Sequence, residues 1–146
     1  MKKVIDKRFA KGKKTYTKVL ETIESIGECP FCPHNFKYHK KPILNKHTGW
    51  FITENNWPYK NTEKHFLIIS EKHKEHFSEL TLTDFSAVRY LVNWATKKFN
   101  IKGGAIALRF GDTSSTGATV CHLHFHFIYP KQDKKNLSKT VLFPIG

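Results

Sequence analysis

Apolar residues recur at helical spacing in two stretches of the chain. Between residues 15 and 27, four aliphatic residues fall on one helical face, namely Val19, Leu20, Ile23 and Ile26. A second helix is expected to begin at Thr81, because Asp84 follows three residues later and completes a capping box. Its predicted buried stripe consists of Phe85, Val88, Leu91, Val92, Ala95 and Phe99. Asn100 is expected to end this helix.

Runs of aromatic, β-branched and alternating apolar residues predict strands between the helices. They occupy residues 49–55, 65–70, 104–110 and 119–129. The order helix, strands, helix, strands predicts an α+β fold with a mainly antiparallel sheet. Residues 1–14 are polar and rich in lysine, so we expect a mobile basic arm there and a single domain over residues 15–146.

The last predicted strand carries three histidines at alternate positions. Successive side chains of a strand point to opposite faces, so His122, His124 and His126 are expected on one face, roughly 6.6 Å apart along the strand. Two chemistries suit such a row. Alternate histidines can share a metal ion. A neutral imidazole can instead attack phosphorus and form a phosphoramidate that water later hydrolyses.

Two cysteines stand close together in a turn bounded by prolines. Cys29 and Cys32 have the C-x-x-C spacing, which is typical of a redox dithiol or of half a zinc site, and which also occurs by chance. No thioredoxin-like pattern surrounds the pair, which disfavours the redox role. A zinc site needs two more ligands, and the chain has 9 histidines.

The overall charge favours anionic partners. The formal net charge is +13, which suits phosphates, nucleotides or nucleic acid, although the basic residues are scattered rather than arranged in a stripe. No apolar stretch approaches the length of about 18 residues that a membrane span needs. We therefore expect no membrane association. No secretory signal or disulfide framework is visible, and we expect a cytoplasmic location.

These motifs resemble, in their order, those of the histidine-triad (HIT) superfamily. Residues 122–128 fit its pattern of three histidines separated by apolar residues, and residues 117–121 resemble its approach to the triad. Residues 65–73 resemble a strand and turn that ends in histidine, and residues 55–58 lie where the family lines its nucleoside pocket. The resemblance covers the chain from about Cys29 to Pro130.

The resemblance implies a HIT-like fold, with a mainly antiparallel sheet of about five strands and two main helices. It also implies an enzyme, a nucleotide hydrolase or transferase that acts at the α-phosphate of conjugates such as diadenosine polyphosphates or nucleoside phosphoramidates. His124 would be the nucleophile that becomes nucleotidylated, His126 would contact phosphate or help orient the site, and Thr119 would bind a phosphate or leaving-group oxygen. Ala118 replaces the glutamine that is usual in the family, which leaves the substrate open.

Three further residues are candidates for substrate binding. Asn55 would lie near the ribose. Trp57 would stack on a base or simply pack in its loop. Asp112 would contact a ribose hydroxyl or leaving group, although a plain turn residue is the favoured interpretation.

The resemblance also implies a structural Zn²⁺ ion. Its ligands would be Cys29, Cys32, His73 and His122, a closed tetrahedral set. Family members are often homodimers, and the helix that begins at Thr81 is a possible interface. Two alternatives stay open at this point: nucleotidyl transfer or deadenylation on a larger nucleic-acid substrate, and a non-catalytic nucleotide sensor, which the complete triad disfavours.

Overall fold

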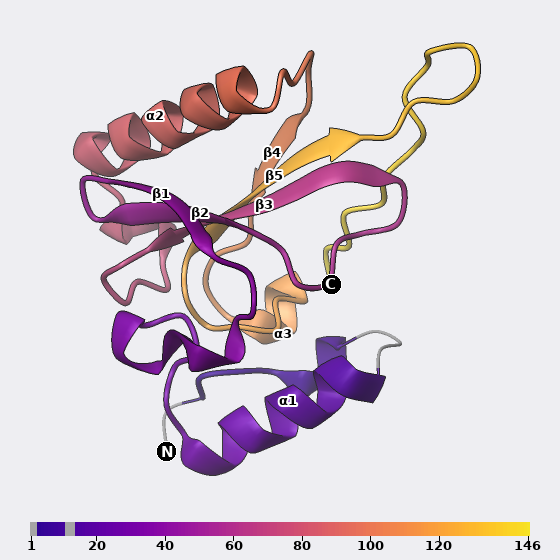
Figure 1. Ribbon diagram of the computed structural model, residues 1–146. Coiled ribbons are helices and arrows are strands. Elements are labelled where there is room, and N and C mark those ends of the chain that lie inside the picture. Colours follow the sequence, from indigo (N-terminus) through magenta and orange to yellow (C-terminus); the bar gives the residue numbers. More distant parts are fainter. Residues whose placement is uncertain (1–2, 11–13) are drawn as a thin grey trace.

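Five strands form one antiparallel sheet in the order β1-β2-β3-β5-β4 in the computed structural model, which describes residues 3–10 and 14–146 (Figure 1). The strands are β1 Ile43–His47, β2 Trp50–Glu54, β3 Thr62–Ser70, β4 Ala105–Leu108 and β5 His124–Pro130. The α-helices are α1 Lys14–Ile26, α2 Leu82–Lys98 and the short α3 Thr113–Thr116. Three 3₁₀ helices are η1 Lys7–Phe9, η2 Pro33–Tyr38 and η3 Phe77–Glu79. The predicted α+β fold, with a five-stranded antiparallel sheet and two main helices, is confirmed.

Helix α2 covers one face of the sheet, opposite α1 and α3 (Figure 1). It begins with the predicted capping box between Thr81 and Asp84. The Asp84 carboxylate also accepts a hydrogen bond from the indole N–H of Trp50 at 2.8 Å, which ties the start of α2 to β2. Phe85 was predicted to be buried but is 40% exposed, because it lies in the first turn of α2 and packs on Phe77 of η3. The core under α2 is built from Trp50, Ile52, Phe66, Ile68, Ala87, Val88, Leu91, Ala95, Ile101, Phe125 and Phe127.

Helix α1 lies on the other side of the sheet (Figure 1). Its predicted apolar face is partly buried through Leu20 and Ile23, which share a small core with Ile5 and Val120. Ile5 belongs to the predicted basic arm and forms an isolated β-bridge with Val120. Residues 1–2 and 11–13 of that arm lie outside the described residues, and its mobility stays a prediction.

Strand β5 is shorter than the predicted strand over residues 119–129. It begins at His124, which is paired with Ile69 of β3. Before this point the backbone has other partners: the N–H of Cys121 donates to the carbonyl of Val4, and the N–H of Leu123 donates to the carbonyl of Lys74. His122 therefore lies before the strand, so the predicted alternation along one strand holds only for His124 and His126, although the rings of His122 and His124 both pack against Phe31.

The chain after β5 returns toward the sheet. Residues 131–139 form a projecting hairpin, shown in yellow in Figure 1, with a bridge between Gln132 and Ser138. The last residues then run back alongside Tyr59 and Arg109, whose guanidinium donates to the carbonyl of Pro144. None of the helices in the described ranges combines the length and apolarity that a membrane crossing requires.

Candidate functional site

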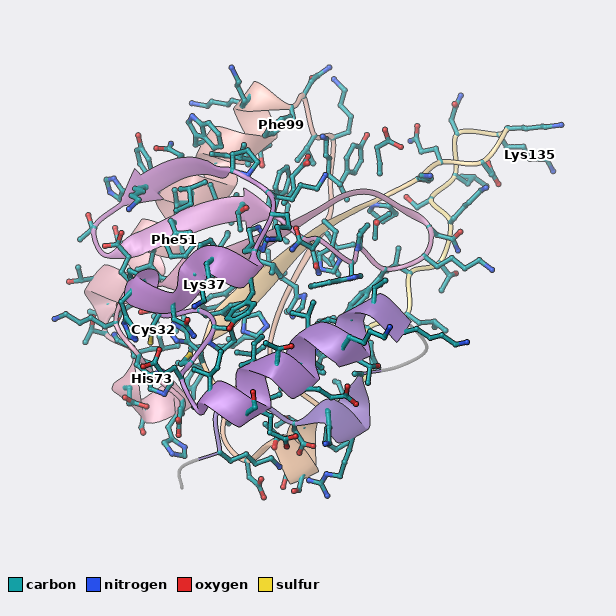
Figure 2. The ribbon with its side chains drawn as sticks, turned by 60° about the horizontal axis from the view of Figure 1, so that its bottom comes forward. Cys32, Lys37, Phe51, His73, Phe99 and Lys135 are labelled. Atoms are coloured by element: carbon teal, nitrogen blue, oxygen red, sulfur yellow. The ribbon has the colours of Figure 1, made fainter. Side chains whose placement is uncertain are left out.

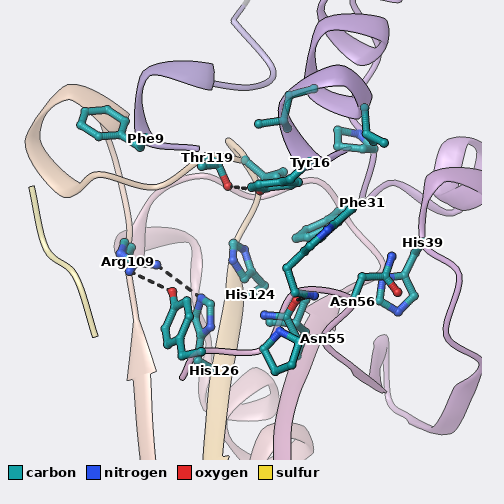
Figure 3. A pocket seen from close by; sticks show the side chains of 18 of the residues that line it. Phe9, Tyr16, Phe31, His39, Asn55, Asn56, Arg109, Thr119, His124 and His126 are labelled. Carbon is teal, nitrogen blue, oxygen red and sulfur yellow. Dashed lines mark hydrogen bonds between the residues drawn. The ribbon is translucent and has the colours of Figure 1, made fainter. Parts of the chain in front are cut away.

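A cavity of about 490 Å³ lies between α1, the turn at residues 29–33 and the beginning of β5 (Figure 3). Its volume is in the range typical of small-molecule sites. Most of the wall is apolar and includes Ile23, Phe31 and Leu67. The polar end is formed by Arg109, Thr119, His124 and His126. The arrangement suits a ligand with one flat apolar part and one anionic part.

His124 has one ring nitrogen committed to the backbone and one directed to the cavity. Nδ1 lies 2.7 Å from the carbonyl oxygen of His122, so Nδ1 carries the proton and donates it to this oxygen. Nε2 is then the unprotonated atom. Burial lowers the pKa of His124 to about 4, and the nearby charge of Arg109 adds to the effect. The ring is therefore neutral at physiological pH, as an attacking imidazole must be.

A chain of hydrogen bonds sets the proton position of His126. The backbone N–H of Tyr59 donates to Nδ1 of His65 at 3.1 Å. Because Nδ1 of His65 accepts, its proton is on Nε2, which donates to Nδ1 of His126 at 2.9 Å. The amide nitrogen of Asn55 lies farther from the same Nε2, at 3.4 Å, and as a second donor it makes no hydrogen bond there. His126 consequently carries its own proton on Nε2. No sequence signal pointed to this role of His65, since the contact between β3 and β5 is not visible in a linear motif.

Two residues of the pocket were not predicted as site residues. Arg109 follows β4 and lies beside His126, with Nη1 at 3.5 Å from Nε2 of that ring (Figure 3). Tyr16 of α1 places its hydroxyl 2.5 Å from Oγ1 of Thr119 and its ring 4.3 Å from the ring of Trp57. Arg109 is a single basic residue inside the predicted strand over residues 104–110, and nothing in that pattern marked it as a site residue. No sequence signal links Tyr16 to Thr119, because 103 residues separate them.

The predicted substrate-binding residues divide into two groups. Asn55, Trp57 and Thr119 line the cavity. Asn55 accepts a hydrogen bond from the backbone N–H of Trp57 at 2.9 Å, which shapes this loop. Asp112 is not among the lining residues and instead caps α3 by accepting from the backbone N–H of Ser114 at 3.0 Å. That position matches the favoured interpretation of Asp112 as a turn residue.

A candidate metal centre lies next to the cavity. The ligand atoms of Cys29, Cys32, His73 and His122 all lie within 4.8 Å of one another, and Figure 2 shows Cys32 beside His73. Nδ1 of His122 is 3.3 Å from Sγ of Cys29, and Nδ1 of His73 is 3.5 Å from Sγ of Cys32. Tetrahedral Zn²⁺, with bonds of about 2.3 Å to sulfur and 2.0–2.1 Å to nitrogen, separates such atoms by about 3.6 Å. The four residues fit one tetrahedral ion.

The opposite ring nitrogens of the two histidines are held by protein acceptors. Nε2 of His122 lies 2.7 Å from the carbonyl oxygen of Ser70, and Nε2 of His73 lies 2.8 Å from the carboxylate of Glu75. These acceptors place the protons on Nε2 and leave both Nδ1 atoms free to bind a cation, the usual support for metal-binding histidines. A metal ion held by all four residues would have no position left for a substrate, which is the arrangement of a structural site.

Phe31 joins the metal centre to the cavity. It lies between the two cysteines in the sequence, and its ring packs edge-on against the rings of His122 at 6.0 Å and His124 at 5.0 Å. The turn that carries the cysteines therefore also forms one wall of the cavity beside His124.

Comparison with known proteins places this arrangement in a family. The HIT domain model matches residues 51–133, which is more than half of the chain. Among curated proteins, none matches the sequence significantly.

Several solved structures have a similar fold. A histidine triad nucleotide-binding protein from Candida albicans is 22% identical, with a TM-score of 0.60, over 82% of this chain and 85% of that one. A Zn-bound histidine triad family protein from Mycobacterium smegmatis is 18% identical, with a TM-score of 0.55, over 77% and 81%. A HIT family hydrolase from Clostridium thermocellum is 20% identical, with a TM-score of 0.54, over 80% and 95%. At these identities the structures show a shared fold, and the domain match shows the relationship. The chain belongs to the HIT domain family.

Proposed function

We propose that this protein is a nucleotide hydrolase or transferase that works through a covalent nucleotidyl group on His124. The observation that carries the proposal is the orientation of this ring: Nδ1 is bound to the carbonyl of His122, and His124 lines a cavity that also contains Thr119 and Arg109. A buried histidine with one free nitrogen beside hydroxyl and guanidinium donors is suited to attack phosphorus. The names of similar structures, a nucleotide-binding protein and a hydrolase, agree with this chemistry.

In the first step, the lone pair on Nε2 of His124 attacks the α-phosphorus of a nucleotide conjugate. A phosphorus–nitrogen bond forms as the bond from phosphorus to the leaving group breaks. The leaving group departs with that electron pair, as an oxyanion from a polyphosphate, and takes up a proton from solvent when it is an amine. The ring becomes positively charged, and the carbonyl of His122 stabilises it through the hydrogen bond to Nδ1. Thr119 lines the same cavity, where its hydroxyl would donate a hydrogen bond to a substrate oxygen.

In the second step, water attacks the phosphorus and releases a nucleoside monophosphate and the neutral ring. An acceptor other than water gives nucleotidyl transfer by the same path. The apolar wall that includes Phe31 and Trp57 would hold the base, with Asn55 near the ribose. Diadenosine polyphosphates and nucleoside phosphoramidates are the substrates to test first.

Capture of the intermediate tests the proposal. The protein is mixed with diadenosine tetraphosphate or adenosine 5′-phosphoramidate, quenched rapidly and analysed by intact mass spectrometry. Wild type should gain the mass of one nucleotidyl group, and His124→Ala should not. His34→Ala removes an exposed histidine of η2 and is the matched control, which should still be labelled. Labelling of the His124→Ala protein at another residue, or its undiminished turnover, would refute the assignment.

We also propose that the metal at the Cys29 and His122 cluster is Zn²⁺. The two sulfurs and two nitrogens are the donors that this ion prefers. When bound, zinc would supply structural cross-linking and no step of the reaction. Elemental analysis of the purified protein should find one zinc per chain, and a different stoichiometric metal would contradict the proposal.

A further inference from the structure

The hydrogen bonds around His126 leave it a donor toward the cavity. Its Nδ1 accepts from His65, so its hydrogen is on Nε2. Burial holds the pKa of His126 well below its usual range, and the neighbouring His124, His65 and Arg109 lower it further, so the ring is neutral with a single N–H. This N–H is on the atom that lies 3.5 Å from Nη1 of Arg109.

The guanidinium of Arg109 is held in place from three sides. Nε donates to the carbonyl of Pro144 at 2.9 Å, and Nη2 donates to the same oxygen and to the hydroxyl of Tyr59 at 3.2 Å. The ring of Phe143 packs against the guanidinium, with its centroid 3.9 Å from Cζ. These contacts occupy Nε and Nη2. Within the described part of the chain, Nη1 has no oxygen acceptor at hydrogen-bond distance and only the nitrogen of His126 near it.

With hydrogen on both Nη1 of Arg109 and Nε2 of His126, the 3.5 Å contact drawn between them in Figure 3 has no acceptor, and both groups are left to donate to a ligand. Two N–H donors at this separation can both reach one oxyanion oxygen at about 2.9 Å, or two oxygens of one phosphate. We propose that Arg109 and His126 form a two-donor fork that binds the non-bridging oxygens of the phosphate attacked by His124. The inference rests on the proposed function, since it takes this phosphate to lie beside His124.

The fork assigns Arg109 a specific role in recognition. A guanidinium brings a permanent positive charge to an otherwise neutral group of rings, and its planar shape matches phosphate. Arg109 would also supply a phosphate-facing donor in place of the glutamine that Ala118 replaces. Because negative charge builds up on the non-bridging oxygens as the nucleophile adds, donors held rigidly by Pro144 and Tyr59 would stabilise the transition state as well as the bound substrate.

Binding of nucleosides and nucleoside monophosphates tests the fork without turnover. Titration calorimetry on the purified protein compares adenosine with AMP, and the guanosine, cytidine and uridine pairs likewise. In wild type, at least one monophosphate should bind more tightly than its nucleoside. Arg109→Met should reduce the ratio of the nucleoside Kd to the monophosphate Kd by about 10- to 100-fold, the range expected for a lost charged hydrogen bond. Arg109→Lys keeps the charge but not the fork and should fall between the two.

Arg89→Met is the matched control, because Arg89 is an exposed residue of α2 and its loss changes the net charge equally. It should leave the ratio unchanged. The inference is overturned if no monophosphate is preferred in wild type, if Arg109→Met keeps the ratio, or if Arg89→Met lowers it as much. If Arg109→Met does not fold, Arg109→Lys decides, and an unchanged ratio in that variant overturns the inference.

The two proposals fail separately. Nucleotide capture on His124 with an unaffected binding ratio in Arg109→Met would reject the fork alone. A ratio that depends on Arg109, without capture on His124, would reject the nucleophile and keep the phosphate site.

Discussion

His122 and His124 are separated by one residue, yet they belong to two sites with opposite designs. In the metal centre, Nε2 of His122 is bound to the carbonyl of Ser70, and Nδ1 faces the sulfur of Cys29. In the cavity, Nδ1 of His124 is bound to a backbone carbonyl, and the ring lines an open cavity. One site is closed by protein ligands, and the other keeps a nitrogen for a substrate.

In each of the two histidines, the nitrogen that meets a backbone carbonyl carries the proton, so the opposite nitrogen is left to bind a metal ion or to attack a substrate. Both histidines are buried, and burial lowers the pKa of each to about 4, so neither burial nor charge separates their roles. Their surroundings separate the two roles, because thiols face His122, whereas Arg109 and Thr119 share the cavity with His124.

The largest effect is expected for substitution of the two histidines by asparagine. His124→Asn should reduce turnover by at least about 10⁴-fold, because the nucleophile is lost, and should change Tm by less than about 3 °C. His122→Asn should lower both metal content and Tm. Steady-state kinetics, elemental analysis and thermal unfolding measure these effects. If both variants lost metal and stability to the same extent, the division into two sites would be wrong.

Loss of a cysteine ligand should act mainly on stability. Cys32→Ser should release the metal and lower the free energy of unfolding by more than about 3 kcal/mol, since the folded centre is stabilised by the bound ion. Urea unfolding with elemental analysis measures this. Cys121→Ser is the matched control, because Cys121 lies outside the four-residue cluster. Equal destabilisation by the two substitutions would contradict a structural metal at Cys32.

Removal of the hydrogen bond that His65 donates to Nδ1 of His126 should have a smaller effect on catalysis. His65→Leu deletes the hydrogen bond to Nδ1 of His126 and allows that ring to change its tautomer. We expect kcat/KM to fall by about 10- to 100-fold, as is usual for residues that orient a functional histidine. His65→Gln can still donate and should recover most of the activity. Equal loss in both variants would show that packing alone matters at this position.

The smallest effect is expected at the contact between α1 and the loop before β5. Tyr16→Phe keeps the ring against Trp57 and removes the hydroxyl that lies 2.5 Å from Thr119. The loss of one hydrogen bond should lower kcat/KM by about fivefold, or about 1 kcal/mol. Tyr90→Phe changes an exposed tyrosine of α2 and should have no effect. An unchanged kcat/KM in Tyr16→Phe would show that this contact does not orient Thr119.

Local pattern was sufficient for much of the fold. Helices α1 and α2 follow from apolar spacing, and the capping box at Thr81 places the start of α2 correctly. Strand β1 was not predicted, because this edge strand has a polar sequence without the alternation of a half-buried strand. The beginning of β5 was misplaced, because the backbone of Cys121 and Leu123 pairs with distant segments and not with a neighbouring strand.

The candidate site was predictable where residue type and spacing carry the chemistry. The histidine motif and the cysteine pair identify residues that the structure brings into two adjoining sites. Arg109 and Tyr16 could not be predicted in this way, because their partners His126, Pro144 and Thr119 lie far away in the sequence. The homodimer, the nucleic-acid substrate and the cytoplasmic location stay predictions.

Residue type and spacing establish which reactive groups the chain carries, namely three alternating histidines and the thiols of Cys29 and Cys32. They also establish the apolar spacing of the two main helices. How those groups are used depends on contacts that form when the chain folds. The proton on an imidazole goes to the nitrogen that meets an acceptor, and for His122 that acceptor, the carbonyl of Ser70, comes from elsewhere in the fold. The proton position of His122 is therefore a property of the assembled fold, whereas His124 finds its acceptor within the motif, at the carbonyl of His122.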